Sequence, residues 1–265
     1  MKSIMSDDGT VVTCQESGEG PPLLIVHGIS SAHYDWQIVA NQLMNHFKVY
    51  VMDRRGRCQS GDHPEYSIEK EFADVAAILN SFEDPVYVLG HSFGGLCTLG
   101  ASLLVSNVRE LILYEPTIAF DPKGMVICYI MEFLLRFNRP EAVLELFMKK
   151  VVGMADEAIE FAIKFAKNQP EWEERLVAAQ TIPREIRALI HYNYSEESFS
   201  GIRIPTILFV GENSSEILKN MASKVHATIP NSKTIELPEQ GHIAMLTAPG
   251  ILAKQVLKTF LYSKL

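Results

Sequence analysis

Short, continuous apolar runs recur along this chain, each bounded by glycine, proline or charged residues. Such runs, rich in Val, Ile and Leu, are typical of strands buried on both faces of a parallel sheet. The runs predict strands at 21–26 (P-P-L-L-I-V), 48–53 (K-V-Y-V-M-D), 85–90 (P-V-Y-V-L-G), 110–115 (E-L-I-L-Y-E), 205–211 (P-T-I-L-F-V-G) and 233–237 (K-T-I-E-L).

Helical periodicity fills the intervals between these runs. An N-terminal hairpin that turns at Asp8-Gly9 comes first, and helices are predicted over 36–44, 68–82, 96–105, 215–227 and 251–262. Strands that alternate with helices favour an α/β fold with a doubly wound, mostly parallel sheet. Crossovers of this kind are right-handed, so helices are expected on both faces of the sheet.

One interval interrupts the alternation. Residues 118–200 contain only helical patterns, such as M-V-I-C-Y-I-M-E-F-L-L-R-F, and this block is too long for a loop. The sequence therefore predicts a core domain in two parts, 1–117 and 201–265, with a helical cap inserted at 118–200.

Composition and charge narrow the classes of function. The chain has 265 residues, 47% of them hydrophobic, which allows a sizeable core. A net charge of −8 argues against a nucleic-acid partner. The N-terminus lacks the apolar segment of a secretory signal, and no apolar run is long enough to span a bilayer.

The cysteines and histidines give no sign of a metal or cofactor. Cys14, Cys58, Cys97 and Cys128 have scattered spacings, so reduced thiols and a cytoplasmic location are expected. The eight histidines form no H-E-x-x-H or mixed Cys/His motif, so neither a metal site nor a cofactor is predicted. The oligomeric state stays open.

The segment G-H-S-F-G, Gly90 to Gly94, carries the strongest chemical signal. It joins a buried-type strand to a helical stretch, and G-x-S-x-G at such a junction forces its serine into a strained turn. The hydroxyl of Ser92 is then exposed above the edge of the sheet. This context favours a nucleophile over a glycine-rich turn that a serine happens to cap.

With this elbow and three other ordered motifs, the chain resembles the α/β-hydrolase superfamily over nearly its whole length. The others are His27-Gly28, D-R-R-G-R-C-Q-S (53–60) and Q-G-H (240–242). The resemblance implies an eight-stranded type of sheet, helices on both faces, a helical cap and a serine-nucleophile, esterase-like activity. Cys58 departs from the motif, which has a glycine there.

Two further roles follow from the resemblance. His242 is the expected general base, since it follows the last strand in the order serine, acid, histidine. The backbone N–H groups of Ile29 and Phe93 are the expected oxyanion-hole donors. His27 is expected to order its own loop, and His91 to point away from the elbow in a structural role.

The catalytic acid is the open question. The family usually has an aspartate in the loop G-E-N-S-S-E-I-L, 211–218, but Ser214 or Ser215 stands at that position. Glu115 ends the preceding buried strand, where some members carry the acid, and is the preferred candidate. Glu212, Glu216 and the absence of any acid are the alternatives.

These residues predict a serine hydrolase that cleaves a small or medium ester, lactone or thioester through an acyl-Ser92 intermediate. One alternative is a slow-turnover, ligand-sensing protein on the same fold. Another is a lyase or C–C bond hydrolase, since a fold does not fix the chemistry. The acyl and leaving groups cannot be identified from the sequence.

Overall fold

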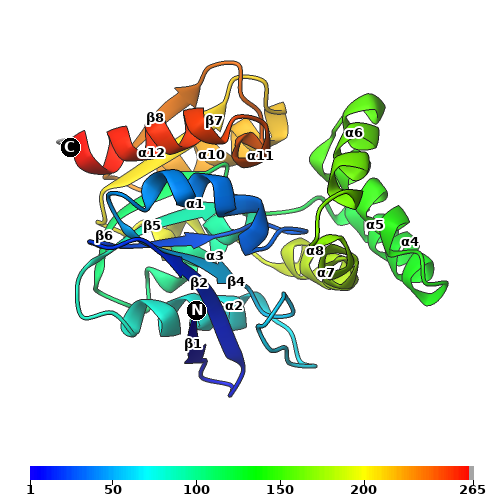
Figure 1. Ribbon diagram of the computed structural model, residues 1–265, viewed down its shortest axis with the longest axis horizontal. Coiled ribbons are helices and arrows are strands. Elements are labelled where there is room, and N and C mark those ends of the chain that lie inside the picture. The colour runs from blue at the N-terminus through cyan, green and yellow to red at the C-terminus, as the bar shows by residue number, and fades with distance from the viewer. Residues whose placement is uncertain (263–265) are drawn as a thin grey trace.

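The centre of the molecule is an eight-stranded sheet, seen in a computed structural model that describes residues 1–262 (Figure 1). The strands lie in the order β1-β2-β4-β3-β5-β6-β7-β8, and only β1 and β2 run antiparallel to their neighbours. Their bounds are β1 Lys2–Met5, β2 Val11–Ser17, β3 Pro22–Val26, β4 Lys48–Asp53, β5 Val86–His91, β6 Val108–Tyr114, β7 Thr206–Gly211 and β8 Ser232–Leu237.

Helices cover both faces of the sheet, as the alternating pattern predicts. One face packs on η1 (His33–Trp36), α1 (Gln37–Leu43), α11 (Ala244–Thr247) and α12 (Pro249–Tyr262). The other face packs on α2 (Ile68–Asn80), α3 (Phe93–Ala101) and α10 (Glu216–Thr228). Strands β3, β5 and β7 are buried along their full length, because both of their faces are covered. The predicted fold class, an α/β-hydrolase fold with a mostly parallel sheet, is confirmed.

Helix α3 begins earlier than its apolar pattern predicts. It starts at Phe93, directly after Ser92, whereas the periodicity places its start at Leu96. The sequence pattern does not predict this first turn, because Gly94 and Gly95 have a low helix propensity. Both glycines permit close packing: a Cβ on Gly94 would lie 2.3 Å from the carbonyl oxygen of Val26.

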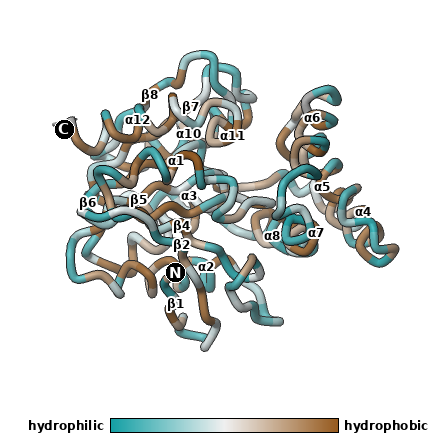
Figure 2. The backbone as a smooth tube through the Cα atoms, in the orientation of Figure 1, coloured by the Kyte–Doolittle hydropathy of each residue, from teal (hydrophilic) through white to brown (hydrophobic). Residues whose placement is uncertain are grey.

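Only helices lie between β6 and β7 among the described residues of that interval. They are η2 Pro122–Gly124, α4 Met125–Arg136, α5 Pro140–Phe147, the π-helix η3 Met148–Val152, α6 Asp156–Lys167, α7 Trp172–Ala178, η4 Ala179–Thr181, α8 Ile182–His191 and α9 Glu196–Phe199. In Figure 1, α4 to α8 project from one side of the sheet, and Figure 2 shows hydrophobic and hydrophilic residues alternating along them. The boundaries 118–200 for a cap domain stay a prediction.

Several aromatic side chains of this insertion are exposed on its surface. Met131 and Phe147 are buried, but Phe133, Phe137, Phe161 and Phe165 are all more than half exposed. Phe133 and Phe137 lie one helical turn apart at the C-terminal end of α4, and Phe161 and Phe165 lie one turn apart on α6. The two rings of each pair are neighbours. These four rings therefore lie on the surface of the insertion and not in its core.

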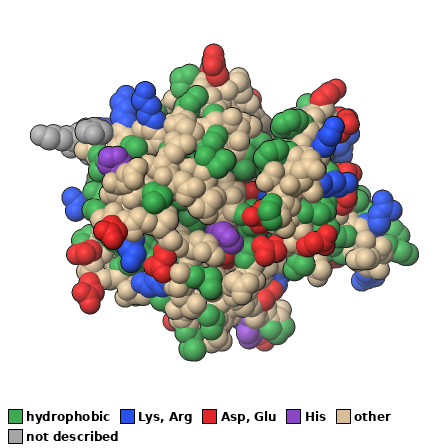
Figure 3. Space-filling model, viewed as in Figure 1, with side chains coloured by type: hydrophobic (Ala, Val, Ile, Leu, Met, Phe, Trp, Pro, Cys, Tyr) green, Lys and Arg blue, Asp and Glu red, His purple; other side chains and the backbone are tan. Residues whose placement is uncertain are grey.

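The charged side chains on one face of the molecule are dispersed (Figure 3). On the face shown in Figure 3, lysine and arginine side chains lie near the edges of the molecule rather than in one continuous area. None of the described helices combines the length and the apolar character that crossing a bilayer requires.

A buried cluster of charged side chains joins the sheet to the insertion. Arg54, at the end of β4, donates to Glu71 on α2 at 2.8 and 3.0 Å and to Glu185 on α8 at 2.9 Å. Arg57 donates to the other oxygen of Glu185 at 2.6 Å and also to the hydroxyl of Thr181. All four charged side chains are fully buried. Burial disfavours the ionised form of Glu185, but the charges of Arg54 and Arg57 outweigh it and lower the pKa of Glu185 to about 2.

Glu185→Gln should destabilise the protein by about 3–5 kcal/mol, because it leaves the buried Arg57 without a counter-charge and Arg54 with Glu71 alone. Denaturant unfolding of the wild type and the variant measures this difference. Asp62→Asn is the matched control: it breaks the Arg184–Asp62 pair, which is partly exposed and contributes about 0–1 kcal/mol.

The difference in unfolding free energy between the wild type and Glu185→Gln should depend on pH. The lowered pKa of Glu185 stabilises the fold above the unfolded-state value near 4.5, and this contribution disappears as the pH falls toward about 2. The gap between wild type and Glu185→Gln should therefore narrow in acid. A gap that stays constant from neutral pH down to acid would contradict this account of the cluster.

Candidate active site

Ser92 stands at the sharp turn between β5 and α3. Its backbone is at φ 54° and ψ −123°, a strained conformation for a residue with a side chain. Gly28 makes room for it, since a Cβ on Gly28 would lie 2.8 Å from the Cβ of Ser92. The strands β3 and β5 are neighbours, and the chain turns to opposite sides of the sheet after them. Ser92 thus lies at a topological switch point, where α/β folds form their sites.

Glu115 and His242 meet at the same edge of the sheet. The Glu115 Oε2 atom lies 2.6 Å from Nδ1 of His242, and its Oε1 atom accepts a hydrogen bond from the Gly211 N–H at 2.7 Å. Glu115 is fully buried and holds a left-handed backbone angle, φ 46°, directly after β6. Both carboxylate oxygens are engaged, so the carboxylate is fixed in position and holds the imidazole ring of His242 in one orientation.

The loop after β7 has a different set of contacts. Glu212 is exposed and its Oε2 atom accepts from the backbone N–H of Glu239 at 2.7 Å. Glu216 is also exposed, at the first position of α10, and Ser215 precedes it as N-cap without a side-chain capping bond. The hydroxyl of Ser214 is buried and has no hydrogen-bond partner among the described residues. Neither glutamate of this loop contacts His242 by a hydrogen bond among those residues.

The loop that carries His242 is held by the residues that precede Ser92 and Glu115. His91 donates from Nε2 to the His242 carbonyl oxygen at 2.9 Å, and their rings lie 4.6 Å apart. The Tyr114 hydroxyl donates to the Gly241 carbonyl and accepts from the Ala244 N–H. His91 therefore holds the loop that carries His242, which is compatible with the structural role expected for it. Burial and the nearby His242 hold the pKa of His91 well below its usual value, which favours the neutral ring.

The loop after β3 is ordered by His27 and Arg54. His27 donates from Nδ1 to the Gly28 carbonyl at 2.8 Å, and its Nε2 accepts from the Arg54 N–H at 3.2 Å. Burial, with the charges of Arg54 and Arg57, keeps the pKa of His27 well below its usual value, which is consistent with this neutral tautomer. The Arg54 guanidinium also donates to the Gly28 carbonyl at 3.0 Å. Two side chains, His27 and Arg54, thus donate to the Gly28 carbonyl and fix the peptide just before Ile29.

The backbone N–H groups of Ile29 and Phe93 can donate to a ligand oxygen, since neither has an acceptor among the described residues. Phe93 is the first residue of α3, where a helix leaves its N–H groups unpaired. The Ile29 N–H has no hydrogen-bond acceptor in the part of the chain that the structure describes. Ile29, Ser92 and His242 all line one cavity.

This cavity has a volume of about 420 Å³ and lies between the edge of the sheet and the insertion. Thr117, which the sequence patterns did not single out, places its hydroxyl 3.2 Å from Oγ of Ser92. The rest of the lining is mostly apolar and includes Phe120, Ile127, Phe147, Met148, Met221 and Met245. Such a lining favours an apolar ligand with a few polar contacts at one end.

Comparison with known protein families identifies the family of this chain. The model of the alpha/beta hydrolase family matches residues 23–255. This chain belongs to the alpha/beta hydrolase family. The match covers the four motifs and the whole insertion between them.

Individual relatives are distant. The chain is 29% identical to an alpha/beta hydrolase of Sphaerobacter thermophilus, with a TM-score of 0.83 over 98% of this chain and 100% of that one. It is similar to a thermophilic esterase of Thermogutta terrifontis, at 20% identity and a TM-score of 0.77 over 97% and 96%. It is also 32% identical to N-formylmaleamate deformylase of Pseudomonas putida, over 38% of this chain and 40% of that enzyme.

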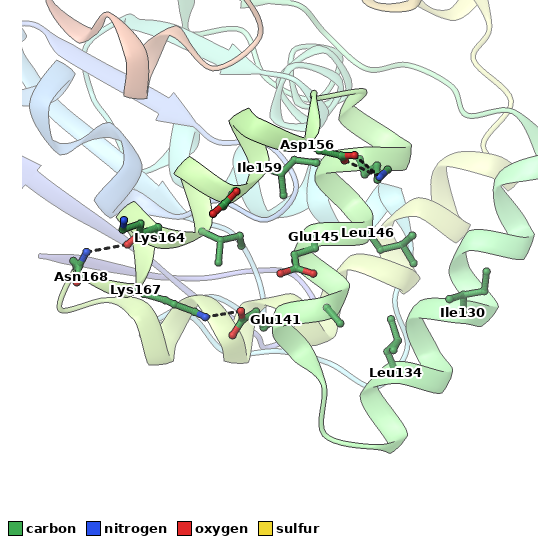
Figure 4. Close-up of a pocket in the computed structure, with 14 residues that line it drawn as sticks. Ile130, Leu134, Glu141, Glu145, Leu146, Asp156, Ile159, Lys164, Lys167 and Asn168 are labelled. Carbon is green, nitrogen blue, oxygen red and sulfur yellow. Dashed lines mark hydrogen bonds and ion pairs between the residues drawn. The ribbon is translucent and has the colours of Figure 1, made fainter.

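This alpha/beta hydrolase has a second, larger cavity of about 810 Å³ on the insertion (Figure 4). Helices α4, α5 and α6 line it, and the Lys167–Glu141 and Lys149–Asp156 ion pairs lie at its walls. It shares no lining residue with the cavity around Ser92. Because it holds no nucleophile with an adjacent base, the smaller cavity is the better candidate for the chemistry.

Sequence motifs did not single out several residues at this candidate site or in contact with it. Thr117 lies in the Y-E-P-T segment that carries Glu115, but no motif marks it. Arg175 of α7 also lines the cavity, and it pairs with Asp35 at 2.6 Å. Arg175 and Glu185 come from an insertion whose helices have no motif. Only their contacts across the fold reveal them.

Gly94→Ala should destabilise this hydrolase by about 1–3 kcal/mol or more, because the new methyl group would overlap the carbonyl oxygens of Val26 and His27. Gly201→Ala is the control, since a Cβ there meets nothing within 4 Å and the backbone angle is ordinary. It should be neutral or stabilise slightly. Denaturant unfolding compares the two; equal stabilities would contradict the tight contact between α3 and β3.

Proposed function

We propose that this alpha/beta hydrolase cleaves a small or medium ester, lactone or thioester through an acyl-Ser92 intermediate. His242 takes the proton of the Ser92 hydroxyl, Glu115 orients His242, and the N–H groups of Ile29 and Phe93 stabilise the oxyanion. The observation that carries the proposal is the 2.6 Å contact between Glu115 Oε2 and His242 Nδ1, at the cavity that Ser92 lines.

The reaction follows from this arrangement. With its Nδ1–H donated to Glu115, the neutral imidazole has an unprotonated Nε2 that can accept the serine proton. Oγ of Ser92 attacks the carbonyl carbon, and the imidazolium that forms is stabilised by the buried carboxylate. His242 then protonates the leaving group and removes a proton from the water that hydrolyses the acyl-enzyme.

The hydroxyl of Thr117 has a place in this scheme. At 3.2 Å it is the hydrogen-bond partner of Oγ of Ser92, and its backbone N–H donates to the Ser92 carbonyl at 3.0 Å. Thr117 therefore holds the serine side chain in one rotamer before the substrate arrives. We assign it a positioning role and no proton transfer.

The choice of an ester, lactone or thioester rests on the site and not on the relatives. The esterase of Thermogutta terrifontis is only 20% identical and supports the fold alone. The cavity of about 420 Å³ and its apolar lining support an acyl group of small or medium size. The Pseudomonas putida relative acts on an N-formyl compound by its name, so formyl amides belong in the substrate panel.

The wild type should react with a serine-directed fluorophosphonate and hydrolyse p-nitrophenyl esters, whereas Ser92→Ala should do neither. An acyl-chain series from acetate to octanoate then measures which acyl length the cavity prefers. Labelling without turnover of any ester would favour the ligand-sensing alternative. Turnover of a diketone but of no ester would favour C–C bond hydrolysis. Unchanged ester turnover in Ser92→Ala would overturn the proposal.

Glu115→Gln should lower kcat by about 10⁴-fold, or roughly 5.5 kcal/mol of transition-state stabilisation. The amide NH₂ that replaces Oε2 would donate to His242 Nδ1, which forces the proton onto Nε2 and removes the base. Steady-state kinetics with the best ester measures the loss, and circular dichroism checks the fold. Glu212→Gln, in the loop after β7, is the matched control and should retain nearly full activity. The reverse ranking would exclude Glu115 as the acid.

A further inference from the structure

Four side chains with metal-ligating atoms meet at the junction of the sheet and the insertion, outside the cavity around Ser92. They are His33 at the start of η1, Asp53 at the end of β4, Cys58 in the following loop, and Glu174 on α7. The ligand atoms of His33, Asp53 and Cys58 all lie within 4.8 Å of one another. Sγ of Cys58 lies 3.6 Å from Oε2 of Glu174. None of the four lines that cavity.

The electrostatic field at this cluster is negative. Nδ1 of His33 lies 2.8 Å from Oδ2 of the fully buried Asp53. The backbone N–H of His33 also donates to Oδ1 of Asp53 at 2.9 Å, so this carboxylate is held beside the ring. The two carboxylates, Asp53 and Glu174, would stabilise a cation bound between these side chains.

We propose that these four side chains form a binding site for a divalent transition metal ion of borderline softness, with Zn²⁺ as the best fit. One imidazole nitrogen, one thiolate and two carboxylate oxygens are a ligand set that suits Zn²⁺, whereas Mg²⁺ and Ca²⁺ prefer oxygen ligands alone. The site is separate from the proposed hydrolytic chemistry and does not depend on it.

The spacing of the ligand atoms is compatible with tetrahedral coordination. Zinc bonds of about 2.0–2.3 Å at tetrahedral angles place neighbouring ligand atoms about 3.3–3.8 Å apart. The Cys58–Glu174 distance of 3.6 Å already has this value. The His33–Asp53 contact of 2.8 Å has to widen, because a hydrogen bond is replaced by two metal bonds. Rotation of side chains supplies this change.

Binding has a defined proton balance. Cys58 releases its thiol proton to solvent and binds as the thiolate. A neutral His33 moves its proton from Nδ1 to Nε2, and a protonated His33 releases one proton more. The affinity for the metal should therefore fall as the pH is lowered.

The backbone at Cys58 supports a role for its side chain. Cys58 has φ 46°, a left-handed conformation that costs a residue with a Cβ about 1–2 kcal/mol and that glycine adopts freely. The related motif has glycine here, so this chain carries a strained cysteine next to a histidine and two carboxylates. Of the four cysteines, Cys58 alone is not buried. It is the accessible thiol.

A bound ion would link the insertion to the sheet. Glu174 belongs to α7, while the other three ligands belong to the core. Arg175, the next residue of α7, pairs with Asp35 and lines the catalytic cavity. The metal would thus fix α7 against the core beside that cavity, as a structural clamp.

Titration of the purified full chain with Co²⁺ tests the site directly. The wild type should bind one ion and develop a near-ultraviolet thiolate-to-metal absorption, and Zn²⁺ should displace the Co²⁺. Cys58→Ser should lose this absorption. Zn²⁺ should raise the melting temperature of the wild type and leave that of Cys58→Gly unchanged. Cys58→Gly is expected to fold well, because glycine relieves the strained φ.

The matched pair of variants lies on α7. Glu174→Gln should weaken Zn²⁺ binding at least about tenfold, measured by competition with a chelating dye. Glu173→Gln, which removes the same charge from the preceding exposed residue, should bind like the wild type. Absence of stoichiometric binding, thiolate absorption that persists in Cys58→Ser, or equal weakening in both glutamate variants would overturn the proposal.

Discussion

The buried ion cluster around Arg54 is the interaction on which the arrangement of this molecule depends. Its guanidinium contacts three separate parts: α2 through Glu71, α8 through Glu185, and the carbonyl of Gly28. A buried arginine requires every one of these acceptors, because an unpaired charge in the interior is costly. The position of the insertion and the conformation of the loop before Ile29 are consequently linked through one side chain.

The proposed catalytic groups are also linked to one another by a few hydrogen bonds. His91 and Tyr114 directly precede Ser92 and Glu115, and both bind the backbone of the loop that carries His242. The three groups therefore cannot shift independently, since each strand end holds part of its neighbour. The left-handed backbone angles of Ser92 and Glu115 are maintained by these contacts. Such rigidity suits a site that must hold several groups in one geometry.

The sequence predicted the central strands well, because β3, β5 and β7 are buried on both faces and therefore read as continuous apolar runs. The elbow at Ser92 was recognisable for a similar local reason, since a strained turn requires small neighbours in sequence. The start of α3 at Phe93 was missed because its glycines serve packing and not helix propensity. The Arg54–Glu185 contact and the cluster at Cys58 join residues far apart in the chain, so no spacing pattern could reveal them.

The position of the proposed acid shows that residues following two different strands can reach the same place in the fold. Strands β6 and β7 are parallel neighbours, and Tyr114 pairs with Phe209, so residues just past either strand reach the same space. What the histidine requires is a fixed carboxylate at its Nδ1, whichever strand supplies it. Here Glu115 leaves β6 and its Oε1 accepts from Gly211, the last residue of β7. The loop G-E-N-S-S-E-I-L thus contributes a backbone N–H that holds the carboxylate, and its serines need no catalytic role.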